Sequence, residues 1–413
     1  MLKEIKALRK EKRIYQKVSY LVIINKIIMK IFLICGEKSG DNLINQILDK
    51  INKDNDVFNN IELAGIVSDE TAKKFNIKQF FNPKELAILG IGDIIFNIPK
   101  IMDRITDTVN EINNFKPDLI ITIDAYDFCI RVVKNIRKTN KTVQIWQIVA
   151  PSVWAYWEFR AKILSKYYNR LFYLLPMERN YFKPLEKNNY KNGNNFSSTF
   201  IGYPASFQEK NIKITKNNKL IGITIGSRKS EVNRHKKLIA SVIMKLKIFD
   251  NNLNFAIFTT ENTEKDIKKL LSDFKNIKFF NKKEDKQKII QECILVIAKN
   301  GTNNVEIGAL GTPMIIYYKT SILTYLFAKC FAKIKTINLF NIVLNKKIIP
   351  EFLQNQATAD NLVNEAMRFI DDENLRQKQI EEINNAIFLM QRKDKKHPID
   401  IVSEEVVKYL NTL

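Results

Sequence analysis

The chain has 413 residues, of which 45% are hydrophobic and 27% are charged, and its formal net charge is +23. This length allows two domains with separate cores, and the composition excludes a largely disordered chain and a polytopic membrane protein. The positive charge would suit nucleic acid, an anionic membrane surface or anionic substrates. The abundance of Lys, Ile and Asn indicates a compositional drift, and this drift explains the larger share of the positive net charge. Without a recognition motif or a basic stripe, we expect no nucleic acid as a partner.

The first 28 residues form a basic extension with an apolar patch over residues 18–28. The patch is too short to span a bilayer, and no small-residue cleavage site follows it, so a signal peptide fits poorly. A basic helix lying on a surface stays open. We expect the fold to begin at Met29, with residues 1–28 a disordered tail or the product of a mis-assigned start codon.

From Lys30 onward, apolar strands alternate with amphipathic helices, which predicts a parallel α/β architecture. The strand over residues 31–35 runs into Gly36-Glu37-Lys38-Ser39-Gly40-Asp41, and a helix is expected over residues 42–52. The Gly-x-x-x-Gly spacing lets the backbone approach another group closely, but it matches neither the dinucleotide fingerprint nor the Walker A pattern.

After a strand over residues 61–66 and a helix over residues 98–114, the apolar strand from Leu119 delivers Asp124 at its carboxyl end. Ligands and catalytic groups gather at that edge of a parallel sheet, so Asp124 is a candidate general base. The alternative, a helix N-cap at Asp124, is equally favoured by the pattern. Asp127 is expected to be the cap.

A strand over residues 143–149 leads into Pro151-Ser152-Val153-Trp154-Ala155-Tyr156-Trp157. These aromatic side chains could fill the core or form a rim for sugar rings or acyl chains. A strand over residues 171–175 follows, and the first domain is expected to end near Pro204.

The second domain opens with a strand over residues 220–225 and the turn Gly226-Ser227-Arg228. A guanidinium beside free N–H groups suits a diphosphate, although a solvated helix start has the same composition. Further strands are expected over residues 255–259 and 277–280.

Residues 296–319 contain a strand, a turn, a helix and a second strand over residues 314–318. Gly301 permits a close turn, and Thr302, Asn303 and Asn304 are expected to cap the helix, whose free N–H groups could hold an anion. Read alone, the segment favours an ordinary capped helix.

An amphipathic helix over residues 322–334 is interpreted as buried, with a membrane contact as the alternative. From Asp360 onward, two charged helices are expected as a solvated flank.

In chain order, these motifs resemble those of lipid-A-disaccharide synthases, bacterial glycosyltransferases of the GT-B type. The resemblance is carried by Gly36-Glu37-x-Ser39-Gly40-Asp41, Gly90-Ile91 before Asp93, Pro117-Asp118, Asp124-Ala-x-Asp127-Phe128, Pro151 to Ala155, Leu175-Pro176-x-Glu178, Gly202-x-Pro204, Gly226-Ser227-Arg228-x-x-Glu231, Gly301-Thr302, Glu306, Gly311 to Met314, Asn341 and Pro350-Glu351. It implies an α/β fold of two Rossmann-like domains facing each other across a cleft. We expect the first at residues 29–205, the second at 206–358 and C-terminal helices at 359–413.

The resemblance implies transfer of a 2,3-diacylglucosamine unit from UDP-2,3-diacylglucosamine to 2,3-diacylglucosamine 1-phosphate, with inversion and release of UDP. Asp124 matches the family's proposed base. The residues that match the family's donor site are Gly226, Ser227, Arg228, Gly301, Thr302, Glu306 and Asn341. Of these, Glu306 matches the residue that binds the ribose hydroxyls. Matches on the acceptor side are Gly36, Glu37, Ser39, Gly40, Asp41, Ser152 and Trp154. No metal and no cofactor are implied, since Arg and helix dipoles can supply the positive charge.

The same resemblance implies a cytoplasmic protein lying peripherally on the inner face of the cytoplasmic membrane, with an anionic membrane surface as a partner; a homodimer stays open. The sequence departs from the family pattern at Lys38, Lys299-Asn300, Asn303-Asn304, Tyr203 and Trp157. The alternative is another UDP-sugar-using GT-B enzyme, an N-acetylglucosaminyl transferase or an epimerase. An epimerase would need further acid and base groups, which a chain so poor in histidine hardly offers.

Overall fold

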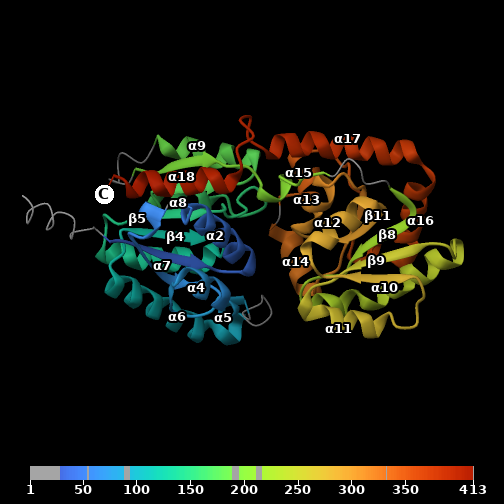
Figure 1. Ribbon diagram of the computed structural model, residues 1–413, viewed down its shortest axis with the longest axis horizontal. Helices are drawn as coiled ribbons and strands as arrows, with labels where there is room; N and C mark the ends of the chain where they lie inside the picture. The colour runs from blue at the N-terminus through green and yellow to red at the C-terminus, as the bar shows by residue number, and fades with distance from the viewer. Residues whose placement is uncertain are drawn as a thin grey trace, which may run out of the picture.

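The structure is a computed structural model that describes residues 28–53, 55–87, 94–187, 195–210, 216–331 and 333–412 (Figure 1). Residues 1–27 of the basic extension lie outside this part of the chain, as does the Gly90-Ile91 motif. The described residues form two sheets that lie side by side, each covered by helices (Figure 1).

In the described part of the chain, the first sheet has seven parallel strands in the order β3-β2-β1-β4-β5-β6-β7. Alternate residues of β1 face opposite sides. Ile31 and Leu33 join one apolar cluster, and Phe32 and Ile34 join the other. Both faces are therefore buried, as a parallel sheet requires. The strands are β1 Met29–Cys35, β2 Ile61–Ile66, β3 Lys78–Gln79, β4 Leu119–Ile123, β5 Gln144–Ile148, β6 Arg170–Tyr173 and β7 Ser197–Phe200.

The helices of this half are α2 Lys38–Ile51, α3 Asn55–Phe58, α4 Asp69–Phe75, α5 Lys84–Ala87, α6 Ile94–Phe115, α7 Tyr126–Thr139, α8 Phe159–Tyr167 and α9 Arg179–Glu186. Helices α6 to α9 cover one face, and α2 and α4 cover the other.

The second sheet has six parallel strands among the described residues, in the order β10-β9-β8-β11-β12-β13. They are β8 Asn217–Thr224, β9 Asn254–Phe258, β10 Ile277–Phe280, β11 Cys293–Lys299, β12 Met314–Tyr318 and β13 Glu351–Leu353. The helices that follow the first domain are α10 Lys229–Phe249, α11 Glu261–Leu270, α12 Lys283–Glu292, α13 Asn303–Ala309, α14 Ile322–Phe331, α15 Leu339–Leu344, α16 Ala359–Asp371, α17 Glu373–Met390 and α18 Pro398–Leu410.

The C-terminal segment differs from the expected pair of solvated helices. It contains three helices, and each buries an apolar face: α16 and α17 pack on the second sheet, and α18 packs on the first. Figure 1 shows α17 running over the second half and α18 over the first. The chain therefore crosses back to the half in which it began.

The two passages of the chain between the halves lie against each other. The Tyr203 N–H donates to the Met390 carbonyl oxygen at 2.9 Å. Arg392 Nη1 donates to the Phe200 carbonyl oxygen at 2.8 Å, and Gln391 Nε2 donates to that of Ser206 at 2.8 Å. The outgoing and returning segments are thus joined by hydrogen bonds on both sides of Gly202.

Candidate active site

Asp124 follows β4 in a backbone conformation that is costly for a residue other than glycine. Its φ is 57°, and that of Ala125 is 40°. The Asp124 N–H donates to the Ile148 carbonyl oxygen at 3.2 Å, and its own carbonyl oxygen accepts from Gln147 Nε2 at 3.3 Å. Left-handed residues of this kind persist where the surrounding structure holds them, often at functional sites.

The glycine loop after β1 packs directly on this turn. A Cβ atom on Gly36 would lie 1.8 Å from the Ala125 Cβ, and one on Gly40 would lie 3.1 Å from Ile123 Cγ2. The close approach predicted from the Gly-x-x-x-Gly spacing is confirmed. It brings Ser39 Oγ to 3.4 Å from Asp124 Oδ2.

Burial raises the pKa of Asp124, and the negative charge of Glu37 raises it further, against a hydrogen bond from Ser39 that lowers it. A carboxylate whose charged form is disfavoured in this way is a stronger base than an exposed one. Its position and its electrostatics therefore suit proton abstraction.

Asp41 does not face this turn with free oxygens. The helix α2 begins at Lys38, so Asp41 lies in its first turn, and its buried carboxylate accepts from Ser68 N at 2.7 Å, Ser68 Oγ at 2.6 Å and Thr71 Oγ1 at 2.9 Å. It ties α2 to the start of α4, which is a structural role.

The expected cap at Asp127 is wrong. The N-cap of α7 is Ala125, and no side chain caps the helix, which also removes the capping interpretation of Asp124. Asp127 instead accepts from Arg160 Nη2 at 2.8 and 3.0 Å. The Arg160 guanidinium lies 4.2 Å from the centre of the Trp157 ring, so this pair fixes the aromatic loop.

The aromatic loop lies where the two halves meet. Trp154 packs against the apolar cluster on the α17 face of the second sheet, and its Nε1 donates to Glu178 Oε1 at 3.3 Å. Burial raises the pKa of Glu178 to about 8, although the Leu174 and Leu175 N–H groups also donate to it. The Ser152 carbonyl oxygen accepts from the Ala155 N–H at 3.0 Å, which closes the turn.

On the second half, Gly226, Ser227 and Arg228 join β8 to α10. The φ of Gly226 is 143°, and a Cβ there would lie 2.7 Å from Glu231 Cβ, so this turn requires glycine. The exposed Arg228 Nη2 lies 3.6 Å from Oε2 of the equally exposed Glu37. The contact places the Arg228 turn opposite the glycine loop that holds Asp124.

Glu231 is a functional candidate that the site prediction missed. Its Oε2 accepts from the Ser227 N–H at 3.1 Å and the Arg228 N–H at 3.4 Å, and its Oε1 lies 2.6 Å from Lys299 Nζ. The signal was present, since an acidic residue three positions after an N-cap is the capping-box spacing.

The turn at Gly301 is built differently from the expectation. Thr302 is the N-cap of α13 but makes no side-chain cap bond, and Asn303 and Asn304 already lie inside the helix. The buried Asn304 amide folds back toward the turn, and its Nδ2 donates to Asn300 Oδ1 at 3.1 Å. Thr302 is therefore at the predicted N-cap position, but the prediction that these side chains cap the helix is wrong.

Two acidic groups reach the junction from opposite halves. Burial raises the pKa of Tyr203, and the charges of Asp124 and Glu306 raise it further, so both carboxylates act on one side chain. Glu306 is exposed on α13.

Asn341 has no polar atom left for a ligand. It is fully buried, Nδ2 donates to the Ile349 carbonyl oxygen and Glu351, and Oδ1 accepts from the Ile348 and Ile349 N–H groups, all at 2.8–2.9 Å. All four hydrogen-bonding positions of the amide are used within the fold. Asn341 is therefore a structural residue here and does not line the candidate site.

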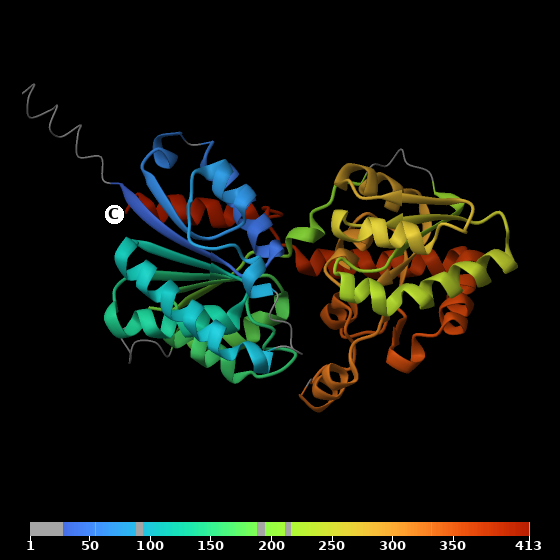
Figure 2. The same ribbon diagram turned by 90° about the horizontal axis from the view of Figure 1, so that it is seen from below.

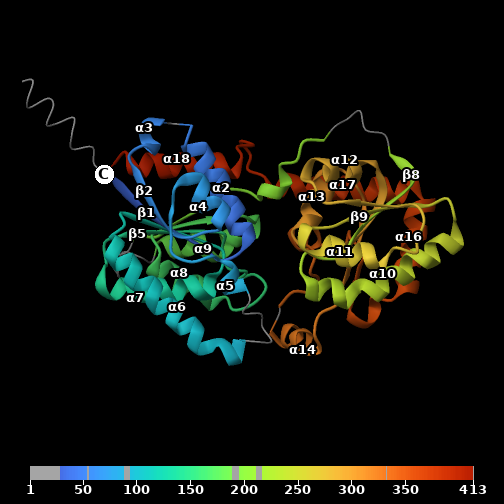
Figure 3. The same ribbon diagram turned by 60° about the horizontal axis from the view of Figure 1, so that its bottom comes forward.

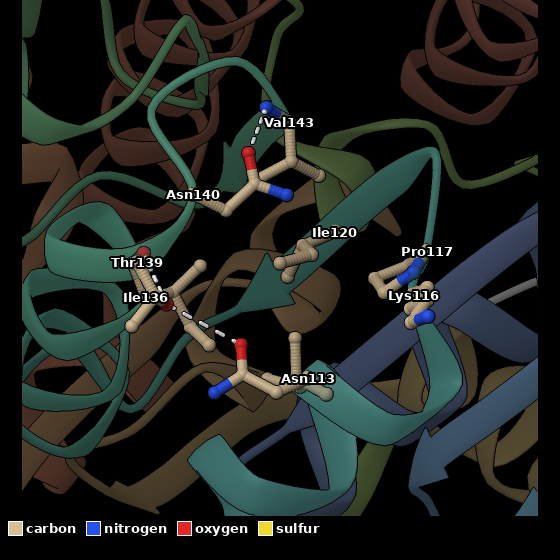
Figure 4. A pocket seen from close by; sticks show the side chains of 9 residues that line it. Asn113, Lys116, Pro117, Ile120, Ile136, Thr139, Asn140 and Val143 are labelled. Atoms are coloured by element: carbon tan, nitrogen blue, oxygen red, sulfur yellow. Dashed lines mark hydrogen bonds between the residues drawn. The ribbon is translucent and has the colours of Figure 1, made fainter.

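A pocket of about 350 Å³ lies elsewhere, at the amino end of β4 (Figure 4). It is lined by Asn113, Lys116, Pro117, Ile120 and Thr139 among others, on the opposite sheet edge from Asp124.

Across the described ranges, no group of three or more His, Cys, Asp or Glu residues is placed to hold a metal ion. No helix among those residues combines the length and the hydropathy needed to cross a bilayer.

The fold is shared with a glycosyltransferase and an epimerase of known structure. A calicheamicin glycosyltransferase superposes with a TM-score of 0.58 at 10% identity, covering 93% of this chain and 98% of that chain. The UDP-GlcNAc 2-epimerase from Neisseria meningitidis bound to UDP-GlcNAc gives 0.56 at 15% identity, covering 93% and 100%. These likenesses confirm the GT-B fold.

The sequence comparisons are more specific. The family model described as lipid-A-disaccharide synthetase matches residues 31–404. The lipid-A-disaccharide synthase of Rickettsia canadensis (strain McKiel) is 33% identical over 391 residues, covering 92% of this chain and 97% of the relative. That of Rickettsia prowazekii (strain Madrid E) is 32% identical over 360 residues, covering 85% and 91%. They do not favour the alternative of an epimerase or an N-acetylglucosaminyl transferase, and the chain belongs to the lipid-A-disaccharide synthase family.

Proposed function

We propose that this protein condenses UDP-2,3-diacylglucosamine with 2,3-diacylglucosamine 1-phosphate to lipid A disaccharide 1-phosphate and UDP. The family match supports the reaction class. The observation that carries the mechanism is the contact between Glu37, beside Asp124 in the first half, and Arg228 in the second. It supports the proposal that Asp124 and Arg228 act at one site.

The proposed reaction is a single displacement. The acceptor hydroxyl oxygen attacks the anomeric carbon of the donor while the bond from that carbon to the β-phosphate oxygen breaks, which inverts the configuration. Asp124 takes the hydroxyl proton, and UDP leaves with the bonding electron pair. Arg228 stabilises the charge that develops on the diphosphate, as a guanidinium can without a metal ion. Glu306, on α13, is proposed to bind the ribose hydroxyls.

A direct assay tests this proposal. Purified protein is incubated with the radiolabelled acceptor and UDP-2,3-diacylglucosamine, and both disaccharide and UDP are quantified. Equal amounts of the two products are expected, and neither should form when one substrate is omitted. Arg228→Ala should raise the KM for the donor and lower kcat together. Release of UDP without disaccharide, or no product at all, would reject the proposed reaction.

We also propose that the protein is cytoplasmic and binds peripherally to the inner face of the membrane, through α14 and its surroundings. Ile322, Tyr325 and Leu326 are exposed on α14, and Figures 2 and 3 show this helix standing apart from the body of the second half. Residues 307–350 contain six lysines and no acidic residue. An apolar helix within a basic stretch suits an anionic bilayer.

Vesicle sedimentation tests the membrane proposal. Binding to phosphatidylglycerol vesicles should exceed binding to phosphatidylcholine vesicles, and Ile322→Asp with Leu326→Asp should abolish it. Phe388→Asp with Leu389→Asp is the matched control, because these side chains are also exposed but lie on α17. Equal losses in both pairs would remove α14 from the proposal.

A further inference from the structure

Lys299 and Glu231 form an ion pair beneath the turn that carries Arg228. Lys299 ends β11, Glu231 lies in the first turn of α10, and Nζ is 2.6 Å from Oε1. Both side chains are 15% exposed, whereas those of Arg228 and Glu37 are 63% and 52% exposed. The Lys299–Glu231 pair is therefore shielded from solvent far more than the Arg228–Glu37 pair.

The pair connects the two segments assigned to the donor. The other Glu231 oxygen accepts from the Ser227 and Arg228 N–H groups, which fixes the backbone of that turn. Lys299 Nζ lies 3.8 Å from where a Cβ on Gly301 would stand, and the Lys299 N–H donates to Thr224 Oγ1 on the neighbouring strand β8 at 2.9 Å. One lysine thus lies between the Gly226–Arg228 turn and the Gly301 turn.

The charges have a consequence for a bound anion. Glu231 places a carboxylate directly under the turn, where it would repel a diphosphate in a poorly solvated setting. The Lys299 ammonium cancels that charge, so Glu231 does not offset the positive field of Arg228. The hydrogen bonds from Lys299 also lower the pKa of Glu231, against burial, which keeps the carboxylate ionised and able to hold both N–H groups.

We infer that Lys299 and Glu231 are positioning residues for the UDP moiety of the donor. Glu231 holds the Arg228 turn in place, and Lys299 neutralises Glu231 so that the turn can accept a diphosphate. The inference rests on the proposed function.

Calorimetric titration with UDP and steady-state kinetics test it in five proteins: wild type, Lys299→Met, Lys299→Arg, the double variant Lys299→Met/Glu231→Gln, and a control. Lys299→Met should weaken UDP binding and raise the KM for the donor by about tenfold, while the KM for the acceptor stays within about twofold. Lys299→Arg should remain close to wild type. The double variant should regain most of the loss, since it removes the uncompensated carboxylate but keeps an oxygen that can accept from the turn.

The control is Lys245→Met, which removes a lysine on α10, the helix that carries Glu231; the carboxylate partner of Lys245 is Asp360 on α16. It should bind UDP as the wild type does. Thermal unfolding of all variants separates positioning from folding. The inference is overturned if Lys299→Met binds UDP normally, if the double variant is no better than Lys299→Met, or if donor and acceptor constants deteriorate equally. A wild type that binds UDP but forms no disaccharide would reject the proposed function, and the binding series would still decide the role of the pair.

Discussion

Asp124 combines two properties that a general base needs, a defined position and a raised pKa. Its left-handed backbone follows the carboxyl end of β4, where Ser39 contacts its carboxylate, and burial with the nearby Glu37 charge raises its pKa. Both properties come from its neighbours rather than from the aspartate itself. They could not be read from the residue alone.

Substituting Asp124 tests its role as the base. Asp124→Asn keeps the size of the side chain but removes the proton acceptor, so kcat should fall by about 10²–10⁴-fold. UDP should bind as in the wild type, which calorimetry would check alongside the rate. Turnover within a few-fold of wild type would exclude Asp124 as the base.

The pH profile should respond to Glu37. Asp124 must be deprotonated to act, so kcat/KM falls on the acid side as pH drops through its raised pKa. Glu37→Gln removes a negative charge that raises this pKa, so the acid limb should move to lower pH. The measurement is kcat/KM against pH for both proteins. An acid limb that stays in place, or moves upward, would show that another group controls it.

The positions of residues that follow strands were predictable. Whether each polar side chain faces a ligand or makes hydrogen bonds inside the fold was not. Asp124, Gly36 and Arg228 follow buried strands, and the carboxyl edge of a parallel sheet gathers such positions. Asn341 and Asp41 stand in equally specific motifs, yet their polar atoms are bonded inside the fold. A motif alone does not distinguish a side chain that reaches a ligand from one that supports the loop beneath it.

At the scale of elements, the interior strands followed from the sequence because they are apolar on both faces. The expected interior strands over residues 61–66 and 314–318 have those bounds in the structure. The expected strand over residues 277–280 does too, although this strand, β10, lies at a sheet edge. The strands that were missed, β3, β7 and β13, are short, and each lies at the edge of its sheet. Edge strands pair on one side only and tolerate polar residues such as Ser197-Ser198-Thr199, so they lack the apolar signal.

The contact between the glycine loop and the turn after β4 predicts that one substitution is harmful and that a second one compensates for it. Gly36→Ala would set two Cβ atoms 1.8 Å apart, so it should destabilise the protein by about 1–3 kcal/mol and reduce turnover. Ala125→Gly in the same protein removes the opposing Cβ and should restore part of both. Urea denaturation and the disaccharide assay measure the two effects. No recovery in the double variant would mean that the harm does not come from this contact.

At the scale of the whole molecule, the C-terminal helix belongs to the core of the half where the chain begins. Val406 on α18 is fully buried in the apolar cluster with Leu33 and Ile44, and Arg170 on β6 pairs with Glu405 at 2.5 Å. The sequence predicted charged helices here but could not show that one of them covers a sheet, because that depends on a crossing between domains. Its buried face was therefore misread as part of a solvated flank.

A charge on that face should unfold the first half. Val406→Asp buries an unpaired carboxylate, which should cost about 3 kcal/mol or more and lower the thermal midpoint of the first half. Lys408→Ala, on the exposed side of the same helix, should leave the midpoint nearly unchanged. Differential scanning calorimetry would resolve the transitions. Similar midpoints for both variants would show that α18 is dispensable for the first half.

The double passage between the halves has a mechanical consequence. Two segments fastened together by the bonds from Tyr203, Gln391 and Arg392 resist twisting and sliding of one half against the other, but they allow bending about the line that crosses both. Bending of this kind changes the distance between loops of the two halves that face each other, including those of Glu37 and Arg228. Hinge bending of this kind would bring the proposed base toward the donor sugar when the halves close, and would let UDP leave when they open.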